Sequence, residues 1–433
     1  MIREMKNSGV EWIGDIPSEW RIGRVKNAFT RKNEKAHQEE PTILSLARSG
    51  VKIRDLSTGE GQIAESYYNY NPVEPFDLLL NPMDLYSGAN CSISKVYGVI
   101  SPAYINLKAN KNYYHVFYDY YFKTQYWAMA FFAHGKGVSY DNRWTLSTET
   151  LMNYYIPVPS LHEQKKIADF LDSKVTQIDK IISETKASIE NYKEYKQSVI
   201  TEAVTKGLDK NVPMKDSGVE WIGDIPSEWE IIKLKKTFSF GKGLPITKEN
   251  LIESGIPVIS YGQIHSKKNT GTSVNEHLIR YVEDTYVNTN PNSLVSTGDI
   301  IFADTSEDLD GCGNCVYVDV DYPLFAGYHT IILRSSQDDN KYYSYLFKTD
   351  CWRSQIRSRV TGIKLFSVTQ KILKEITIIQ PPEKEQIRIA EILDRKCAKI
   401  DNIIKTKEIL ITNLEEYKKS LIYEYVTGKK AVE

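Results

Sequence analysis

The chain contains two copies of one peptide, and this internal repeat constrains its fold more than any other feature. The thirteen residues SGVEWIGDIPSEW occupy positions 8–20 and return letter for letter at 217–229. A later segment, PSLHEQKKIADFLDSKVTQIDKII at 159–182, resembles PPEKEQIRIAEILDRKCAKIDNII at 381–404. We therefore predict two halves that share one order of elements and are related by a pseudo-twofold axis.

Each half ends in a long polar segment whose apolar residues alternate in steps of three and four. This 3.5-residue period predicts a coiled-coil helix, and no Pro or Gly interrupts it. Gly207 and Gly428 follow the two segments, where a helix C-cap belongs. About 43 residues at ~1.5 Å per residue predict a helix ~65 Å long. The seam residues are Leu171, Ile178, Ile182 and Ile189 in the first segment and Leu393, Ile400, Ile404, Ile411 and Leu414 in the second.

A helix with one narrow apolar stripe needs a partner that covers the stripe. The two segments could act as separate dimerisation arms, or they could pair with each other in antiparallel orientation within the chain. Their matched periods and lengths favour the internal pairing. Three lysines, Lys196, Lys407 and Lys418, interrupt the apolar seam.

The segments that precede these helices have a mixed character. Short apolar runs between Gly, Pro and Asn turns predict strands, and the aromatic-rich stretch 113–135 predicts one buried helix that ends at Gly135. The stretch 339–358 takes the same helical position in the second half. The predicted fold class is α/β (α+β), with two mixed domains separated by two long helices that pair as an antiparallel coiled coil. The predicted boundaries are 1–158 for the first domain, 159–210 for the central helix, 211–380 for the second domain and 381–433 for the C-terminal helix.

Composition and charge exclude several classes of protein. The longest nearly unbroken apolar run, 126–133, is far shorter than the ~18 residues of a membrane-spanning helix, and the N-terminus has no signal region. We therefore expect a cytoplasmic protein without membrane contact. The net charge is −1, and Lys+Arg and Asp+Glu number 17 and 16 in residues 1–155 and 18 and 21 in residues 211–378. Contact with nucleic acid would therefore require local clusters of cations or positive charge from partner subunits.

No motif predicts a catalytic residue or a metal site. The chain lacks a P-loop, a GxSxG elbow, an HExxH helix and the [DNS]PP[YF] motif of amino-methyltransferases. Cys312 and Cys315 form a CxxC, but zinc would need two further ligands, and no second CxxC or HxxxH occurs. We therefore interpret them as ordinary loop cysteines, with a metal or redox role as the alternative.

Each domain contains three polar loops whose Arg, Lys, Gln, Asn, Ser and Tyr side chains can bond phosphates and base edges. The loops lie at 45–55, 81–90 and 134–144 in the first domain and at 260–271, 302–311 and 353–364 in the second. Any surface loop is polar, so a single loop is weak support for DNA contact. The candidate DNA-contacting residues are Arg48, Lys52, Arg54, Tyr86, Lys136, Tyr140, Arg143, Tyr261, Gln263, His265, Lys267, Lys268, Arg357, Arg359 and Lys364.

The repeated peptide itself is too apolar for a free surface segment. It contains Trp12 and Trp20 in the first copy and Trp221 and Trp229 in the second, and its Gly and Pro predict a turn-rich strap. The strap could simply pack on its own domain, or it could join the domain to the helices near the docking place of a partner subunit. Tryptophan favours burial with its indole N–H satisfied, so we expect packing against domain and helix.

Taken together, the twin straps, the two P-x-x-x-EQ-x-x-IA helix starts and the order of the halves resemble the specificity (S, HsdS) subunit of type I restriction–modification enzymes. The resemblance covers residues 9–428. It implies that each domain is a target-recognition domain for one half of a bipartite, asymmetric DNA site, and that the helices set the gap. It implies a subunit without its own active site or cofactor. Two modification subunits would supply S-adenosylmethionine and adenine-N6 methylation, and two restriction subunits would supply ATP- and Mg²⁺-dependent cleavage.

Two other hypotheses remain open at this point. The chain could be a coiled-coil scaffold whose two domains bind proteins, which a DNA mobility-shift assay would distinguish. It could also be a DNA-mimicking decoy, although a mimic needs a densely acidic surface and the charge here is balanced.

Overall fold

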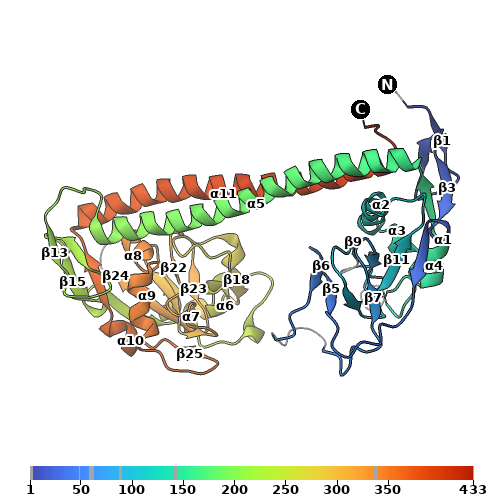
Figure 1. Cartoon of the computed structure of the whole chain (residues 1–433). Coiled ribbons are helices and arrows are strands. Elements are labelled where there is room, and N and C mark those ends of the chain that lie inside the picture. The colour runs from blue at the N-terminus through green and yellow to red at the C-terminus, as the bar shows by residue number, and fades with distance from the viewer. Residues whose placement is uncertain are drawn as a thin grey trace. The chain divides into compact units, whose positions relative to one another are not determined.

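The computed structural model describes residues 3–47, 49–57, 63–86, 90–139, 144–335 and 340–432. The chain forms two compact units, the first comprising Met1–Lys186 with Glu408–Glu433 and the second Ala187–Lys407. Each unit contains one mixed domain and a part of each long helix (Figure 1).

Both domains are built on a four-stranded antiparallel sheet with the same strand order. In each sheet the third strand in the sheet order is completely buried, with the sequence LLL in the first domain and IIFA in the second. The predicted repetition of one fold in the two halves is therefore confirmed. The strands are, in sheet order, β4 (Phe29–Lys32), β11 (Ile105–Ala109), β8 (Leu78–Leu80) and β9 (Cys91–Ile93) in the first domain, and β16 (Phe238–Lys242), β24 (Thr330–Ser335), β20 (Ile300–Ala303) and β22 (Cys315–Tyr317) in the second.

Smaller sheets complete each domain. The first domain has the hairpin β5 (Leu44–Ala47) and β6 (Gly50–Ile53) and the pair β7 (Asn71–Val73) and β10 (Gly98–Ile100). The longer second domain has a second four-stranded sheet in this part of its chain. Its strands are β18 (Arg280–Val282), β17 (Ile256–Ile259), β23 (Leu324–Ala326) and β19 (Leu294–Val295), and a further pair joins β21 (Thr305–Ser306) to β25 (Phe366–Ser367).

The aromatic helix predicted at 113–135 is two helices, α2 (His115–Trp127) and α3 (Ala130–Ala133). The break lies at Met129, whose left-handed backbone (φ 57°) costs roughly 1–2 kcal/mol for a residue with a side chain. The turn places Phe131 in the core against Phe122, Tyr126 and Tyr154, and burying a Phe contributes ~1.5–3 kcal/mol. The single-helix prediction was wrong because this tertiary gain outweighs the local cost. The equivalent stretch of the second domain is also two helices, α8 (Lys341–Leu346) and α9 (Asp350–Arg357), but no left-handed residue lies at this break.

Short helices connect the strands. The helices α4 (Thr148–Asn153) and α10 (Gln370–Glu375) hold equivalent places in the two domains. Each begins after an N-cap, Ser147 or Thr369, whose side chain accepts a hydrogen bond from the backbone N–H of the third residue after it. The remaining short helices are α1 (Val25–Ala28), α6 (Tyr261–Ile264) and α7 (Tyr286–Thr289), with 3-10 turns at Leu234–Lys236, Lys248–Asn250, Glu276–Leu278 and Pro291–Ser293.

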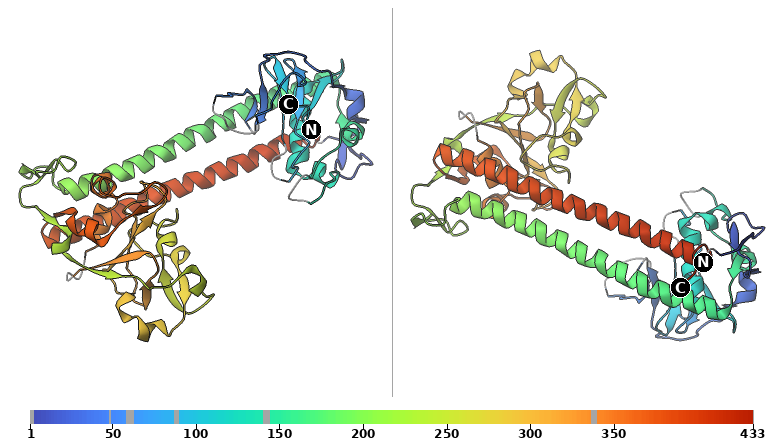
Figure 2. Two further views of the ribbon diagram at one scale, coloured as in Figure 1. Left: turned by 90° about the horizontal axis from the view of Figure 1, so that it is seen from below. Right: turned by 90° about the horizontal axis from the view of Figure 1, so that it is seen from above.

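The two long helices, α5 (Leu161–Lys206) and α11 (Glu383–Val426), lie side by side (Figure 2). In the first unit Phe170 contacts Tyr425, with ring centroids 4.5 Å apart, and the interrupting Lys418 reaches Asp179 at 2.5 Å. In the second unit the interrupting Lys196 reaches Asp401 at 2.6 Å. Within the first unit Phe170 of α5 contacts Tyr425 of α11, and the later Asp179 contacts the earlier Lys418, so the two helices run in opposite directions, as predicted.

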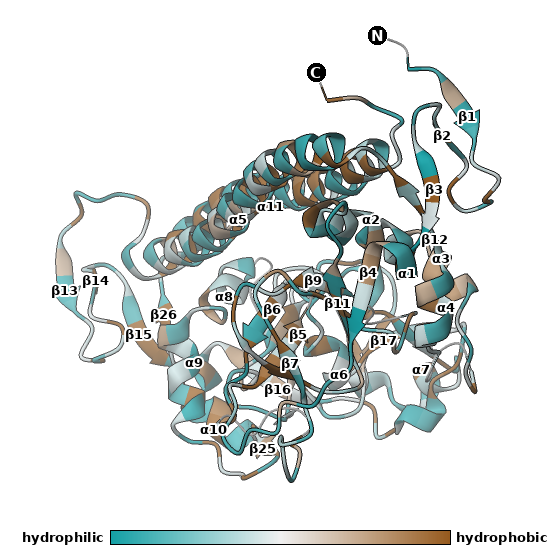
Figure 3. Ribbon diagram, turned by 45° about the vertical axis from the view of Figure 1, so that its right-hand side comes forward, coloured by the Kyte–Doolittle hydropathy of each residue, from teal (hydrophilic) through white to brown (hydrophobic). Residues whose placement is uncertain are grey.

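The seam of the coiled coil is apolar and narrow. Most predicted seam residues are buried, whereas Ile404, Ile411 and Leu414 are half-buried. The other faces of both helices are largely hydrophilic (Figure 3). The third interrupting lysine, Lys407, lies 5.7 Å from the centroid of the Tyr192 ring, a distance typical of a cation–π contact.

Each repeated strap closes a junction of helix ends. In the first unit the buried Trp20 donates its indole N–H to Glu163 of the EQ pair at the start of α5, at 2.9 Å. The same ring lies against Gly428, the left-handed residue (φ 74°) after α11, where a Cβ atom would be 3.0 Å from it. The strap therefore holds the start of one long helix to the end of the other.

The second unit repeats this clasp with the helices exchanged. Trp229 donates to Glu385 at the start of α11, at 2.8 Å, and lies against Gly207 (φ 77°) after α5. The following glutamine of each EQ pair bonds the proline carbonyl before the helix, Gln164 to Pro159 and Gln386 to Pro381. The clasp explains why the strap and the helix start are duplicated together, since each needs the other.

The other tryptophan of the strap differs between the copies. Trp12 is half-buried and stacks on Tyr154 with ring centroids 5.0 Å apart, whereas Trp221 is 43% exposed. The positions equivalent to Tyr154 and Tyr155 hold Ile376 and Thr377 in the second domain, so it lacks the aromatic surface. The expectation of burial is therefore wrong for Trp221.

Each strap forms a short hairpin, and the strand after each strap pairs with the strand before the next long helix, with matched registers in the two halves. The pairs are β1 (Met5–Asn7) with β2 (Asp15–Pro17), β13 (Met214–Asp216) with β14 (Asp224–Pro226), β3 (Arg21–Arg24) with β12 (Tyr155–Val158), and β15 (Glu230–Lys233) with β26 (Thr377–Gln380).

Within the described residues every helix is too short or too polar to span a bilayer.

Candidate nucleic-acid interface

Three predicted loops of the second domain converge on one hydrogen-bond network. The imidazole of His265 donates from Nε2 to the Thr305 carbonyl at 2.7 Å and accepts at Nδ1 from the Asn314 amide at 3.0 Å. Arg353 donates to Asn314 Oδ1 at 2.5 Å and to the Asp310 carbonyl at 3.1 Å. The network joins the loops 260–271, 302–311 and 353–364 to one another. Both nitrogens of His265 serve this network, so we assign that candidate a positioning role.

Asn314 was not among the candidates from the sequence, although it joins all three loops. Replacing it with alanine removes the partner of Arg353 and of His265 at once. We expect the free energy of unfolding of the second unit to fall by about 1–3 kcal/mol, the range for an unsatisfied buried polar group. Thermal melting monitored by circular dichroism measures this change. Asn269→Ala removes three hydrogen bonds but spares the network, so it is the control for loop pairing, and DNA selectivity should fall only in Asn314→Ala.

Positive charge is concentrated in one segment of the second domain. Residues 351–374 contain six Lys and Arg residues and no Asp or Glu, although the domain as a whole has a slight acidic excess. Four of these cations are engaged within the protein: Arg353 by the network above, Arg357 by Asp350 at 2.6 Å, Arg359 by the Gln355 carbonyl at 2.7 Å, and Lys374 by the Phe240 ring. Lys364 is exposed. Lys364 and Lys371 are therefore the exposed cations of this segment that remain for contact with phosphates.

The remaining candidates of this domain lie in the neighbouring loop. Lys267 and Lys268 are exposed, and Tyr261 packs edge-on against His265 and Tyr328. Gln263 accepts a hydrogen bond from the Ser260 N–H at 3.2 Å in a capping box at the start of α6. The two lysines are therefore available to a ligand, whereas Gln263 has a structural use.

The three loops of the first domain also converge. Asn90 donates to the Ala47 carbonyl at 2.7 Å, which joins the loop 81–90 to the β5–β6 hairpin. The backbone N–H of Leu85 bonds the Trp144 carbonyl at 3.1 Å, which joins the same loop to 134–144. Lys52, Tyr86 and Lys136 are exposed on these loops and Arg54 is half-buried. The candidates Arg48, Tyr140 and Arg143 lie outside the described residues.

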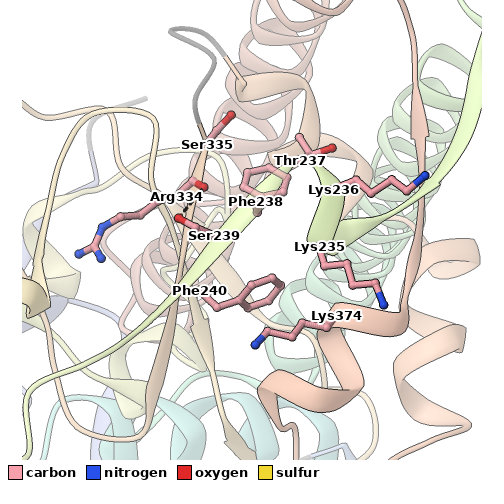
Figure 4. A pocket seen from close by; sticks show the side chains of 9 residues that line it. All are labelled: Lys235, Lys236, Thr237, Phe238, Ser239, Phe240, Arg334, Ser335 and Lys374. Atoms are coloured by element: carbon pink, nitrogen blue, oxygen red, sulfur yellow. Dashed lines mark hydrogen bonds between the residues drawn. The ribbon is translucent and has the colours of Figure 1, made fainter.

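An open groove of about 540 Å³ lies elsewhere on the second domain, lined by four cations, Lys235, Lys236, Lys374 and Arg334 (Figure 4). Three of them are engaged: Lys235 pairs with Glu375 at 2.6 Å, Lys374 lies 5.2 Å from the Phe240 ring centroid, and Arg334 bonds the carbonyls of Asn292 and Leu294. The groove is not formed by the candidate loops, and we assign no ligand to it.

The CxxC cysteines are buried in the core of the second unit. Burial raises the pKa of the Cys315 thiol to about 12, and burial followed by the charge of Asp308 raises the pKa of Cys312. Thiols of raised pKa are poor nucleophiles and poor metal ligands. In the part of the chain that the structure describes, no group of three or more His, Cys, Asp or Glu side chains could hold a metal ion.

Comparison with known proteins identifies one family. A family model described as the type I restriction modification DNA specificity domain matches residues 85–191 and 226–413. The chain is 24% identical over 447 residues to the putative type I restriction enzyme MjaX specificity subunit of Methanocaldococcus jannaschii, covering 96% of this chain and 95% of the relative. It is 25% identical over 280 residues to the MjaVIII specificity subunit of the same organism, covering 64% of this chain and 62% of the relative, which is less than two thirds of that protein.

Two solved structures share the fold. A chain from a type I restriction–modification system, described for its complex assembly and conformational transition, superposes with a TM-score of 0.70 at 14% identity and covers 96% of this chain and 99% of its own. The HsdS subunit from Thermoanaerobacter tengcongensis superposes with a TM-score of 0.52 at 13% identity and covers 98% and 100%.

Proposed function

The chain belongs to the family of type I restriction–modification DNA specificity subunits, and from this membership we propose that each of its two domains reads one half of a bipartite, asymmetric DNA site. The observation that carries the proposal is the contrast between scaffold and loops. The two domains share their sheet order and their Trp–Glu clasp. Their convergent loops share almost no residues. Two domains of one fold with different loops are suited to two different sequences on one duplex.

The chemistry of methylation and cleavage would belong to partner subunits. The chain has no P-loop and no [DNS]PP[YF] motif. We infer that two modification subunits supply S-adenosylmethionine and adenine-N6 methylation, and two restriction subunits supply ATP- and Mg²⁺-dependent cleavage. The relative solved for complex assembly supports an assembly of this kind. With a net charge of −1, this chain would also depend on its partners for many phosphate contacts.

The paired helices would set the gap between the half-sites. The two helices are nearly equal in length, with 46 residues in α5 and 44 in α11. Their antiparallel pairing fixes which part of one helix faces which part of the other, through pairs such as Lys196–Asp401. A continuous helix without Pro or Gly is stiff along its axis, so its length is a natural measure of a gap.

Substitutions in the loops of one domain should affect one half-site only. We expect Lys267→Ala, Lys268→Ala or Arg359→Ala to weaken recognition of the second half-site by roughly 5- to 150-fold if the residue contacts a base, without changing selectivity for the first. A lysine that contacts only phosphate should instead weaken binding to all sequences and lower its salt dependence. Lys136→Ala and Arg143→Ala should act on the first half-site alone. Competition binding with duplexes altered in one half measures both effects.

The division of labour is tested by methyl transfer with labelled S-adenosylmethionine. We expect no transfer by the purified chain and site-specific transfer when the modification subunit is added at two copies per chain. Transfer by the chain alone would contradict the proposal. If a mobility-shift assay at fixed salt showed no sequence-selective DNA binding with or without the modification subunit, a coiled-coil scaffold with two protein-binding domains would be favoured instead.

A further inference from the structure

The second domain holds one aliphatic side chain almost entirely in solvent. Ile363 is 98% exposed, at the tip of the loop between α9 and β25. Both ends of the loop are anchored, because Val360 and Phe366 pack against the apolar core of the domain and β25 pairs with β21. The two ends of the loop are therefore held in place by the domain, and Ile363 lies between them.

A tight turn projects this side chain outward. The backbone carbonyl of Leu365 approaches Gly362 so closely that a Cβ atom on Gly362 would lie 2.1 Å from it. Only glycine fits such an approach, since real Cβ atoms do not come so near to backbone atoms. Ile363 is followed in the sequence by the exposed Lys364 and then by Leu365, which is 55% exposed.

The first domain presents a counterpart in the equivalent loop. Counting back from the matched N-caps Ser147 and Thr369, the loop before α4 corresponds to the loop before α10. Its ends are closed by reciprocal backbone hydrogen bonds between Lys136 and Thr145, each 2.9 Å, and Val138 is 91% exposed. Both domains therefore project a β-branched aliphatic side chain from the loop before the same short helix.

An exposed β-branched side chain beside an exposed lysine fits a specific position on DNA. The lysine would bond a phosphate, and the apolar tip then needs an apolar group on the duplex. The 5-methyl group of thymine is the apolar group that base edges present in the major groove. We propose that Ile363 is a specificity-determining residue that contacts a thymine 5-methyl group in the major groove of the second half-site. The inference rests on the proposed function, since it assumes that this domain reads DNA.

The test removes the two methyl-bearing partners separately. The full chain is assembled with its modification subunit and bound to duplexes of its methylated site in which each thymine of the second half is replaced in turn by deoxyuridine. At one position we expect about a three- to fivefold loss of affinity, the value for one buried methyl group. Ile363→Ser should show a similar loss with thymine and no further loss with deoxyuridine there. Ile363→Val, which keeps a branched apolar surface, should retain most of the deoxyuridine effect.

Matched variants separate this contact from other causes. Ile363 is almost fully exposed, so its substitution should leave the melting temperature unchanged. Val138→Ser in the first domain should leave the deoxyuridine effect in the second half-site intact. The inference would be overturned if no replacement of thymine by deoxyuridine lowered the affinity. It would also be overturned if a replacement lowered the affinity of the wild type and of Ile363→Ser equally. A loss of binding in Ile363→Ser without any deoxyuridine effect would also overturn it, in favour of insertion between bases. In each of these outcomes site-selective binding persists, whereas failure of the proposed function would abolish it.

Discussion

Replacing Trp229 with alanine is expected to lower the free energy of unfolding of the second unit by about 3–5 kcal/mol. The indole is fully buried, so its removal leaves a cavity at the junction of the strap with Gly207. It also leaves the carboxylate of Glu385 without the N–H that it accepts at 2.8 Å. Differential scanning calorimetry or denaturant unfolding followed by circular dichroism measures the loss.

The repeat supplies a matched control for this prediction. Trp221 has the same neighbours in sequence as Trp12 but is 43% exposed, so Trp221→Ala should change stability by less than about 1 kcal/mol. Trp20→Ala should destabilise the first unit as Trp229→Ala destabilises the second. A double-mutant cycle of Trp229→Phe with Glu385→Ala, which removes the donor and the acceptor of the bond, should show coupling of about 0.5–3 kcal/mol. Additive effects would mean that the hydrogen bond does not hold the clasp.

Deleting one heptad from each long helix is expected to shorten the recognised gap by about three base pairs. Removal of residues 189–195 from α5 and 403–409 from α11 shortens each helix by ~10 Å, and base pairs rise ~3.4 Å along DNA. The heptad keeps the apolar stripe in register. The flanking pairs Lys196–Asp401 and Lys418–Asp179 remain in the chain. Sequencing of methylated sites in cells that carry the variant and its modification subunit measures the gap.

A deletion in only one helix serves as the control. It should shift one seam against the other by seven residues on one side of the deletion, separate one of the two flanking ion pairs and abolish site-specific methylation. If the double deletion left the gap unchanged, or altered the bases of either half-site, the helices would not act as the spacer.

The long helices and the repeat could be predicted from the sequence because their signals are local and periodic. The alternation of apolar steps identified the seam, and Gly207 and Gly428 marked the C-caps, where both have positive φ. The break at Met129 could not be predicted, because it depends on where Phe131 packs in three dimensions. The network through Asn314 was missed for the same reason, since its three loops are distant in the sequence.

The clasp gives a physical reason for the identity of the two straps. Each strap meets the same combination of partners, a glutamate at a helix start and a glycine after a helix end. Trp20 and Trp229 therefore cannot change without loss of the bond to the glutamate and of the close approach to the glycine. The loops carry no such shared constraint, and Ile363 and Val138 stand in loops of unrelated sequence.

The central claim, that each domain reads one half of the site, is tested most directly by mapping adenine methylation across the genome of cells that carry the chain and its modification subunit. The wild-type chain should produce one gapped, bipartite motif. A variant with the loops 260–271, 302–311 and 353–364 taken from a relative should change the bases of one half and leave the other half and the gap as they were. A continuous motif, or a change in both halves from loops of one domain, would contradict the account.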